Sequence, residues 1–338
     1  MASITEIAKR ANVSTMTVSN VINKKYQKVS SSTRERVEKV IEEMNYVPNL
    51  SARSLKSNNS KIIVFAIPQT IVDDPNKDSA FTNPFYGELI NSIEFHLREK
   101  GYYLMFRFVN DDERLSSMVK TWSVDGVIVL GALEKELSTI FADIHVPLIL
   151  IDTYIDSPEY DCITTEDEAG GRMATEYLLD HGYRKLGMVA SSIGETGVAQ
   201  KRYQGYRDAL ASRGMRFEES MLFEGFPSYE FGIEVASRIA KRKDEFDAMF
   251  VYSDLVAIGL INGLKNQGIR VPQDIAVIGF DGLFIGELCE PRLTTIKQDI
   301  GAKGQKAVEL LVRKLNRDSE GVENIVLPVT IVERDSVV

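Results

Sequence analysis

The chain has 338 residues, a formal net charge of −9 and a hydrophobic content of 44%. It is too long for one ordinary hydrophobic core and is expected to form about two or three domains. The hydrophobic content argues against disorder, and the longest apolar runs, at 62–67 and 147–151, have the length of strands and exclude a membrane-spanning helix.

The expected compartment follows from two features of the sequence. The N-terminus lacks the apolar segment of a secretion signal. Cys162 and Cys289 are too few for a disulfide framework and indicate a reducing compartment, where both are expected to be partly buried thiols. We therefore expect a cytoplasmic protein with no membrane partner.

Charge is divided unevenly along the chain. Residues 1–60 carry 10 Lys and Arg against 5 Asp and Glu, whereas the remaining residues carry 30 against 44. A basic segment attached to an acidic body is typical of a protein in which only the first part touches nucleic-acid phosphate.

A short helix is predicted at the N-terminus. Ser3 and Glu6 have the spacing of a capping box at its start. A turn at 12–13 leads to a second helix, which is capped by Ser14 and continues through about Asn23. The apolar residues of the first helix recur with helical spacing and form one face: Ile4, Ile7, Ala8 and Ala11.

The second helix has an inward apolar face and an outward polar face. Val18, Val21 and Ile22 are expected to face the core. In a helix-turn-helix, the first exposed residues of the second helix contact base edges. Asn20 can pair with adenine through two hydrogen bonds, and Met16 can contact a thymine methyl group. The outward face consists of Thr15, Met16, Thr17, Ser19 and Asn20.

A third helix is predicted to begin at Ser32, with Glu35 as its capping partner, and to be stopped by Pro48. These three helices alone could equally be a structural bundle. The stretch 49–56 (NLSARSLK) favours DNA binding, because it has too little apolar surface to fold alone yet carries Leu55. An apolar side chain inserted at a base step kinks DNA, so we expect a short hinge helix that forms on the minor groove. The third helix is expected to pack through Val37, Val40, Ile41 and Met44.

The pairing of VSTMTVSNVINK (13–24) with NLSARSLK (49–56) resembles the lac/galactose repressor family of transcriptional regulators. The resemblance implies that the second helix reads one half-site of double-stranded operator DNA. It also implies that paired hinge helices of a homodimer insert their leucines, here Leu55, at the centre of a pseudo-palindromic operator, with Lys56 in the minor groove. Thr15, Met16 and Asn20 match the specificity positions. The full set of expected DNA contacts is Thr5, Ser14, Thr15, Met16, Thr17, Ser19, Asn20, Asn23, Tyr46, Asn49, Ala52, Arg53, Leu55 and Lys56.

From Lys61 onward, predicted strands and helices alternate. Two successive arrays of this kind predict two doubly wound parallel sheets, with a ligand in the crevice beyond the carboxyl ends of the strands. The expected fold class is an N-terminal all-α helix-turn-helix headpiece plus an α/β core that resembles a periplasmic binding protein. Strands are predicted at about 62–67, 102–109, 126–131 and 147–152, and, in a second set that begins near Tyr160, at about 185–191, 222–226, 248–253 and 274–281.

We expect a helix-turn-helix domain at 1–48, a hinge helix and linker at 49–60 and an effector-binding core at 61–338. A helix at 301–317 and a strand at 323–333 come late enough to return to both lobes. The resulting ranges are about 61–158 plus 294–320 for the N-subdomain and about 161–290 plus 321–338 for the C-subdomain, with crossovers at 153–160, 290–294 and 318–322.

Residues just after the strands are expected to face the crevice, where aromatic rings and hydrogen-bonding groups suit a polyhydroxylated ligand. Family resemblance singles out Arg202 and Asp281. The alternatives are a surface ion pair for Arg202 and a structural cap for Asp281. The predicted effector-binding residues are Phe85, Tyr86, Asp152, Arg202, Phe226, Tyr229, Ser253 and Asp281.

The core departs from the family pattern at three points. Pro227 stands where relatives carry a stacking aromatic residue, so Phe226 or Tyr229 is expected to replace it. Gly282 stands where a second polar residue is common. The loop 69–82 is longer than usual and is expected to act as a lid or to enlarge the pocket. Asp254 is expected to cap the helix that follows it, without touching ligand.

An enzymatic function is disfavoured. His96, His145 and His181 are scattered, and the chain has no nucleophile elbow, phosphate loop or dinucleotide fingerprint. We expect no catalytic residue, metal or cofactor. The predicted function is a sequence-specific DNA-binding transcriptional repressor controlled by a small molecule, for which we favour a sugar. A purine- or nucleoside-responsive repressor and a regulator controlled by a protein corepressor are alternatives, and a sugar-binding protein or an enzyme is the alternative from another class.

The expected mechanism joins the crevice to the hinge. A ligand changes the arrangement of the lobes in a dimer, which changes the separation of the two hinge helices and so the affinity for operator. Release by an inducer and binding with a corepressor both remain open. The chain shows no heptad segment after its last strand, so we expect a dimer.

Overall fold

The computed structural model describes residues 3–46, 59–69, 83–110, 115–155, 159–194 and 197–338. The chain forms two compact units, Met1–Ser60 and Lys61–Val338. The predicted fold class is confirmed: the first unit is helical, and the second is an α/β core with two separate sheets.

Three α-helices and a 3₁₀ turn build the first unit: α1 (Ile4–Arg10), α2 (Thr15–Ile22), η1 (Tyr26–Lys28) and α3 (Ser31–Glu43). The predicted capping box is confirmed, because Ser3 and Glu6 bond to one another in both directions. The Ser14 hydroxyl caps α2 by accepting a hydrogen bond from the Thr17 amide at 3.1 Å. The centre of the unit consists of fully buried apolar side chains from all three helices: Ile7, Ala11, Val18 and Val37.

The predicted start of the third helix, at Ser32 with Glu35, is wrong. α3 begins at Ser31, and its cap is Ser30, whose hydroxyl accepts a hydrogen bond from the Thr33 amide. Three consecutive serines are equivalent as caps in the sequence, and the extended backbone of Ser30 is what selects it. The helix ends at Glu43, so Pro48 is not what stops it.

Six strands form the sheet of the first lobe, in the order β11-β5-β4-β3-β1-β2, and every neighbouring pair is parallel. These strands are β1 (Ile62–Pro68), β2 (Tyr103–Val109), β3 (Gly126–Leu130), β4 (Leu148–Ile151), β5 (Asp161–Thr165) and β11 (Asn324–Leu327). The helices of this lobe are α6 (Pro84–Glu99), α7 (Leu115–Thr121), α8 (Glu134–Thr139) and α14 (Ile300–Asn316).

The sheet of the second lobe has the order β12-β10-β9-β8-β6-β7, and only β12 runs antiparallel to its neighbour among these described strands. Its strands are β6 (Leu186–Ala190), β7 (Leu222–Glu224), β8 (Ala248–Val251), β9 (Ala276–Asp281), β10 (Thr294–Gln298) and β12 (Val329–Val332). Its helices are α9 (Asp167–Asp180), α10 (Val198–Ser212), α11 (Tyr229–Ala240), α12 (Asp254–Asn266) and α13 (Ile285–Leu288), with 3₁₀ turns η3 (Glu219–Met221) and η4 (Lys243–Glu245).

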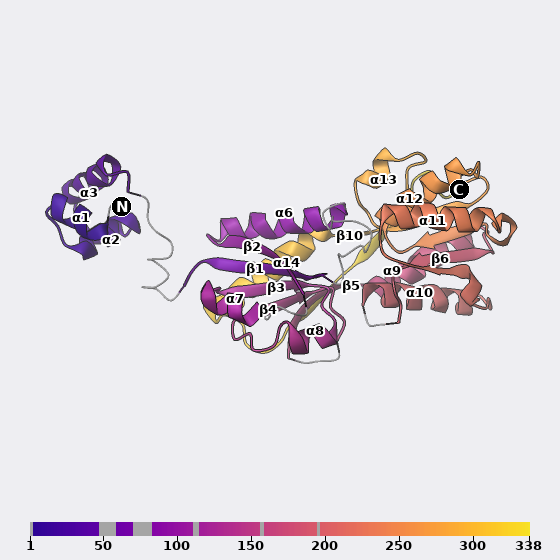
Figure 1. The fold of residues 1–338 in the computed structure, drawn as a ribbon, viewed down its shortest axis with the longest axis horizontal. Coiled ribbons are helices and arrows are strands. Elements are labelled where there is room, and N and C mark those ends of the chain that lie inside the picture. The colour runs from indigo at the N-terminus through magenta and orange to yellow at the C-terminus, as the bar shows by residue number, and fades with distance from the viewer. Residues whose placement is uncertain (1–2, 47–58, 70–82, 111–114, 156–158, 195–196) are drawn as a thin grey trace. The chain divides into compact units, whose positions relative to one another are not determined.

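Each sheet is covered by helices on both faces (Figure 1). Along β1, Ile63 and Phe65 pack under α6 and α14, whereas Val64 and Ala66 pack under α7 and α8. This alternation follows from the two-residue period of a strand. In the second lobe, α9 and α10 lie together on one face and α11 and α12 on the other. Both faces of both sheets are therefore apolar. Polar side chains that could contact a ligand are expected at the ends of the strands.

The predicted division of the core between lobes is wrong in three places. β5 pairs with β4 and belongs to the first lobe, β10 belongs to the second, and the predicted strand 323–333 is two strands, one in each sheet. The chain passes between lobes at Glu166, Asp299 and Pro328, not at 153–160, 290–294 and 318–322. Strand propensity is local, whereas the choice of sheet depends on long-range pairing.

Within the described part of the chain, no helix combines the length and the apolar character that crossing a membrane requires.

Candidate functional site

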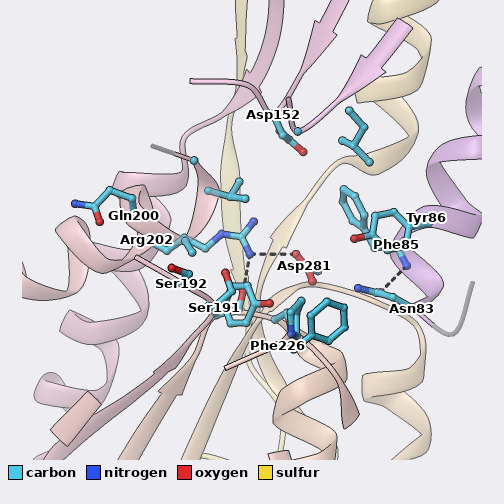
Figure 2. Close-up of a pocket in the computed structure, with 18 of the residues that line it drawn as sticks. Asn83, Phe85, Tyr86, Asp152, Ser191, Ser192, Gln200, Arg202, Phe226 and Asp281 are labelled. Carbon is cyan, nitrogen blue, oxygen red and sulfur yellow. Dashed lines mark hydrogen bonds and ion pairs between the residues drawn. The ribbon is translucent and has the colours of Figure 1, made fainter. Parts of the chain in front are cut away.

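A cavity of about 770 Å³ opens where the carboxyl ends of strands from both lobes face one another (Figure 2). Its wall combines aromatic rings with charged and hydroxyl side chains. The predicted effector-binding residue Tyr229 is not in its lining, and neither is Asp254, which was expected not to touch ligand. The predicted residues that line it are Phe85, Tyr86, Asp152, Arg202, Phe226, Ser253 and Asp281.

Arg202, on α10, is buried at the centre of the cavity wall. Its Nε donates to Asp167 Oδ1 at 2.7 Å, and its Nη1 donates to the Tyr252 carbonyl and, at 3.4 Å, to Asp281 Oδ1. The guanidinium carbon also lies 3.5 Å from the centre of the Phe280 ring. Burial opposes its charge, but the two carboxylates outweigh burial and raise the pKa of Arg202 above its ordinary value. Arg202 is thus a permanent, rigidly held cation and not a surface ion-pair partner.

The bonds at Nε and Nη1 leave one edge of the guanidinium unused. Among the described residues, Arg202 Nη2 has no hydrogen-bond partner. Because Arg202 lines the cavity, this edge is available to an acceptor on a ligand.

Asp281 ends β9 and stands beside Arg202. Its backbone has a φ of 118°, and Gly282 follows with a φ of 76°. The Lys297 side chain leaves no room for a Cβ at residue 282, so the glycine that departs from the family pattern is required by this turn. Gln298 Nε2 donates to Asp281 Oδ1 at 2.8 Å. Burial raises the pKa of Asp281 to about 6.

Asp152, just after β4, is held by a lysine that sequence reasoning missed. Lys303, on α14, donates to both carboxylate oxygens of Asp152 at 2.7 Å and to Gln298 Oε1 at 2.6 Å. Burial raises the pKa of Asp152, and the Lys303 ammonium opposes this shift. A signal for Lys303 does exist in the sequence: it falls on the apolar face of α14, between Ile300 and Ala307.

Ser253 is the cap residue of α12, but its hydroxyl does not cap the helix. Among the buried side chains that the structure describes, Ser253 Oγ is the one polar atom without a hydrogen-bond partner. Asp254 is not a helix cap either, so that prediction is wrong. It is the first residue of α12, and its carboxylate accepts hydrogen bonds from the Leu283 amide and the Thr295 hydroxyl.

The aromatic residues divide between the cavity and the core. Phe85 and Tyr86 lie in the first turn of α6, which Asn83 caps, and their rings meet edge-to-face with centres 5.7 Å apart. Phe226 lies on the opposite side of the cavity in Figure 2. Tyr229 instead packs against the core of the second lobe, and its hydroxyl accepts a hydrogen bond from Asn262 at 3.0 Å. Of the two candidates for the stacking position, the structure places Phe226 at the cavity.

The predicted DNA contacts of the first unit lie largely on its surface. Thr5, Ser14, Thr15 and Met16 are exposed, with Met16 at 64%. Thr17, Ser19, Asn20 and Asn23 are partly exposed, and Asn23 Nδ2 donates to the Ser19 carbonyl at 2.7 Å. Tyr46 packs against the core of the unit. Predicted contacts that lie outside the described residues are Asn49, Ala52, Arg53, Leu55 and Lys56, and residues 70–82 of the predicted long loop also lie outside them.

No group of three or more His, Cys, Asp or Glu in the described ranges is placed to hold a metal ion. His96 and His181 each bond through Nδ1 to the carbonyl one turn earlier on their own helices.

Two family models match this chain. Residues 3–49 match the bacterial regulatory proteins of the lacI family, and residues 175–337 match a periplasmic binding protein-like domain. The HTH-type transcriptional repressor PurR of Pasteurella multocida (strain Pm70) is 33% identical, over 100% of this chain and 99% of that protein. The ribose operon repressor of Haemophilus influenzae is 31% identical, over 100% of this chain and 99% of that protein.

Solved structures match over the same length. The lac repressor dimer bound to operator and the anti-inducer ONPF has a TM-score of 0.85 at 25% identity, covering 99% of this chain and 98% of that one. A complex of the transcriptional regulator CelR with cellobiose has a TM-score of 0.74 at 27% identity, covering 99% of this chain and 100% of that one.

Proposed function

This chain belongs to the lacI family of bacterial regulatory proteins, and its whole-length relatives named above are transcriptional repressors. We propose that its cavity binds a sugar and that this ligand controls operator affinity. The protein acts in the cytoplasm as a homodimer on a pseudo-palindromic operator. The relatives named above are repressors, so the cavity is assigned a binding role and no reaction.

The observation that carries this proposal is the buried Ser253 hydroxyl that lacks a partner among the described residues. A buried polar atom without a partner costs free energy, which a ligand hydroxyl at this place would recover. Arg202 Nη2 offers a donor and Asp281 an acceptor in the same cavity, and Phe85 and Phe226 offer apolar ring surface. This is the mixture of groups that a polyhydroxylated ring requires.

A purine or nucleoside is the second candidate ligand. The same aromatic side chains can stack on a planar base, and several whole-length relatives are named PurR. The Ser253 hydroxyl and the free Arg202 edge would then meet the polar edge of the base.

A thermal-shift panel of sugars, sugar phosphates, nucleosides and nucleobases tests the assignment. A ligand at about 100 times its dissociation constant stabilises the folded protein by roughly 2.7 kcal/mol, which is readily measured. One class of hit identifies the effector. A panel without any hit argues against control by these small molecules and favours control by a protein corepressor.

The DNA half of the proposal is tested by selecting operator sites from a random duplex library. We expect a sequence with two-fold symmetry, because a homodimer presents two copies of α2. Titrating that operator with and without the effector then assigns the sign of control. A selected site without symmetry contradicts binding as a homodimer.

A further inference from the structure

Lys303 is the only fully buried lysine among the described residues, at 0% exposure. It lies on α14, which packs against α6, β3 and β4 of the first lobe. Leaving an ammonium without water costs several kcal/mol unless the protein supplies compensating partners. A buried lysine at this position is therefore expected to have a role beyond packing.

The partners of Lys303 use all of its donors. The three N–H groups of Nζ are matched by Asp152 Oδ1, Asp152 Oδ2 and Gln298 Oε1, at 2.7, 2.7 and 2.6 Å. The Phe85 ring centre lies 5.6 Å from Nζ. Lys303 itself does not line the cavity, but Asp152, Gln298 and Phe85 all do. What a ligand meets is therefore the group that Lys303 holds.

The charged groups around Asp152 explain why it needs this cation. Asp167 faces it from α9, Arg202 from α10 and Lys303 from α14, and Asp281 joins the same network through Gln298. Arg202 is already bonded to both Asp167 and Asp281. Without Lys303, Asp152 would be a buried carboxylate beside other carboxylates, and it would take up a proton.

We propose that Lys303 is a positioning residue of the effector cavity, which keeps Asp152 ionised and turned toward the ligand as a hydrogen-bond acceptor. It thereby selects an uncharged effector that donates hydrogen bonds. This inference rests on the proposed function of the cavity as an effector site.

Charge in the cavity wall supports the same ligand class. Asp152, Glu224 and Asp281 line the cavity, whereas Arg202 is the one Lys or Arg in the lining that the structure describes. Arg202 is paired, and the donors of Lys303 are saturated. Arg202 Nη2 can still donate to a ligand, but the charge of Arg202 is already balanced by Asp167 and Asp281, so a phosphate or carboxylate group would add negative charge beside these carboxylates without a cation to offset it.

The role of Lys303 is tested without any ligand, by measuring the melting temperature of wild type, K303M, D152N and K303M/D152N between about pH 5 and pH 8. In K303M, protonated Asp152 is tolerated and ionised Asp152 is not, so the loss of stability should grow as the pH rises. We expect a loss of about 5 °C or more near pH 8. The double variant should recover more than half of that loss and should show no such pH dependence.

A purely structural role for the lysine stem predicts a different result. The loss in K303M would then be independent of pH, and D152N would not restore stability; either finding overturns the proposal. If K303M fails to fold, a folded K303M/D152N protein supports the proposal, whereas failure of both overturns it. K303R, which keeps the charge, should retain the wild-type pH profile.

Matched ligand pairs test the effector class. Neither D-ribose 5-phosphate nor D-glucose 6-phosphate should raise the melting temperature of the wild-type protein above that seen with D-ribose or D-glucose. A phosphate ester that stabilises the protein more than its parent sugar overturns the assignment of an uncharged ligand. Because the variant series uses no ligand, its outcome is independent of the thermal-shift panel, and failure of that panel counts against the proposed function alone.

Discussion

At the scale of single residues, the cavity combines charged side chains that are held by partners with a buried hydroxyl that has none among the described residues. Arg202, Asp152 and Asp281 each have partners, whereas the Ser253 hydroxyl has none among the described residues. Paired side chains keep the shape of the cavity before a ligand binds. An unpaired group contributes the most binding free energy when a ligand forms a hydrogen bond with it. The two kinds of residue should therefore respond differently to substitution.

Ser253→Ala should separate binding from stability. We expect effector affinity to fall by roughly 1 kcal/mol, about fivefold, because one hydrogen bond to the ligand is lost. The melting temperature of the free protein should stay unchanged or rise slightly, since the variant removes a buried hydroxyl that has no partner in the described structure. Calorimetric titration and a thermal melt measure the two quantities, and a clear drop in the melting temperature would argue for a structural role.

Asp281 should give the protein a pH-dependent stability. Its pKa is about 6 in the folded protein, against about 3.9 when unfolded, so the folded state binds more protons between these values. The free energy of unfolding of wild type should therefore fall relative to D281N, by roughly 2 kcal/mol, as the pH rises from about 4 to about 6. Denaturant titrations across this range provide the measurement. Parallel curves for the two proteins would show that Asp281 does not titrate there.

At the scale of secondary-structure elements, we expect α2 and the stretch 49–56 to make different kinds of contact with DNA. α2 is held by its Ser14 cap and by the buried Val18 and Val21, so its other face is presented as a rigid surface. A helix positioned in this way can read base edges, whereas the sequence of 49–56 predicts an element that orders on the minor groove. Changes in the two elements should produce distinct defects.

Asn20→Ala should reduce discrimination between operator and unrelated DNA, and it should leave the affinity for unrelated DNA nearly unchanged. Loss of a paired contact to adenine is expected to weaken operator binding by about 1–3 kcal/mol, with little change in binding to unrelated duplex. Competition experiments at fixed salt compare the two affinities. An equal loss on both duplexes would mean that Asn20 contacts the backbone.

Leu55→Ala should weaken operator binding while the melting temperature of the protein stays the same. The reason is that the wedge acts only on bound DNA, where it unstacks a base step. DNA bending, measured by energy transfer between dyes at the duplex ends, should fall together with affinity. Full bending and affinity in the variant would exclude the wedge.

At the scale of the whole molecule, the polar network of the cavity lies next to two of the passages between lobes. Asp167 follows the passage at Glu166, and Gln298 precedes the passage at Asp299. The same network joins Asp152 of the first lobe to Arg202 of the second through Lys303, Gln298 and Asp281. A ligand that bonds to it therefore acts where rotation of the lobes would occur.

Effector and operator should consequently be coupled in both directions. If the effector changes operator affinity by some factor, about 5- to 150-fold, then operator DNA must change effector affinity by the same factor. Titrating effector into the protein, with and without selected operator, measures the second factor. Equal effector affinities in the two titrations would mean that the cavity does not regulate DNA binding.

The sequence alone determined the fold class and the kind of function of this protein, because the features that indicate them are local in the chain. Neighbours in the chain set the helix caps, the helical and strand periodicity, and the residues that follow each strand. The headpiece, the two-sheet core and most of the cavity residues could therefore be predicted from the sequence. Tertiary structure decided which sheet receives β5, β10 and β11, that Tyr229 packs in the core and Phe226 lines the cavity, and that Lys303 is paired with Asp152. These facts depend on contacts between residues far apart in the chain, and a lysine on an apolar helix face does not reveal its partner until the fold brings the two together.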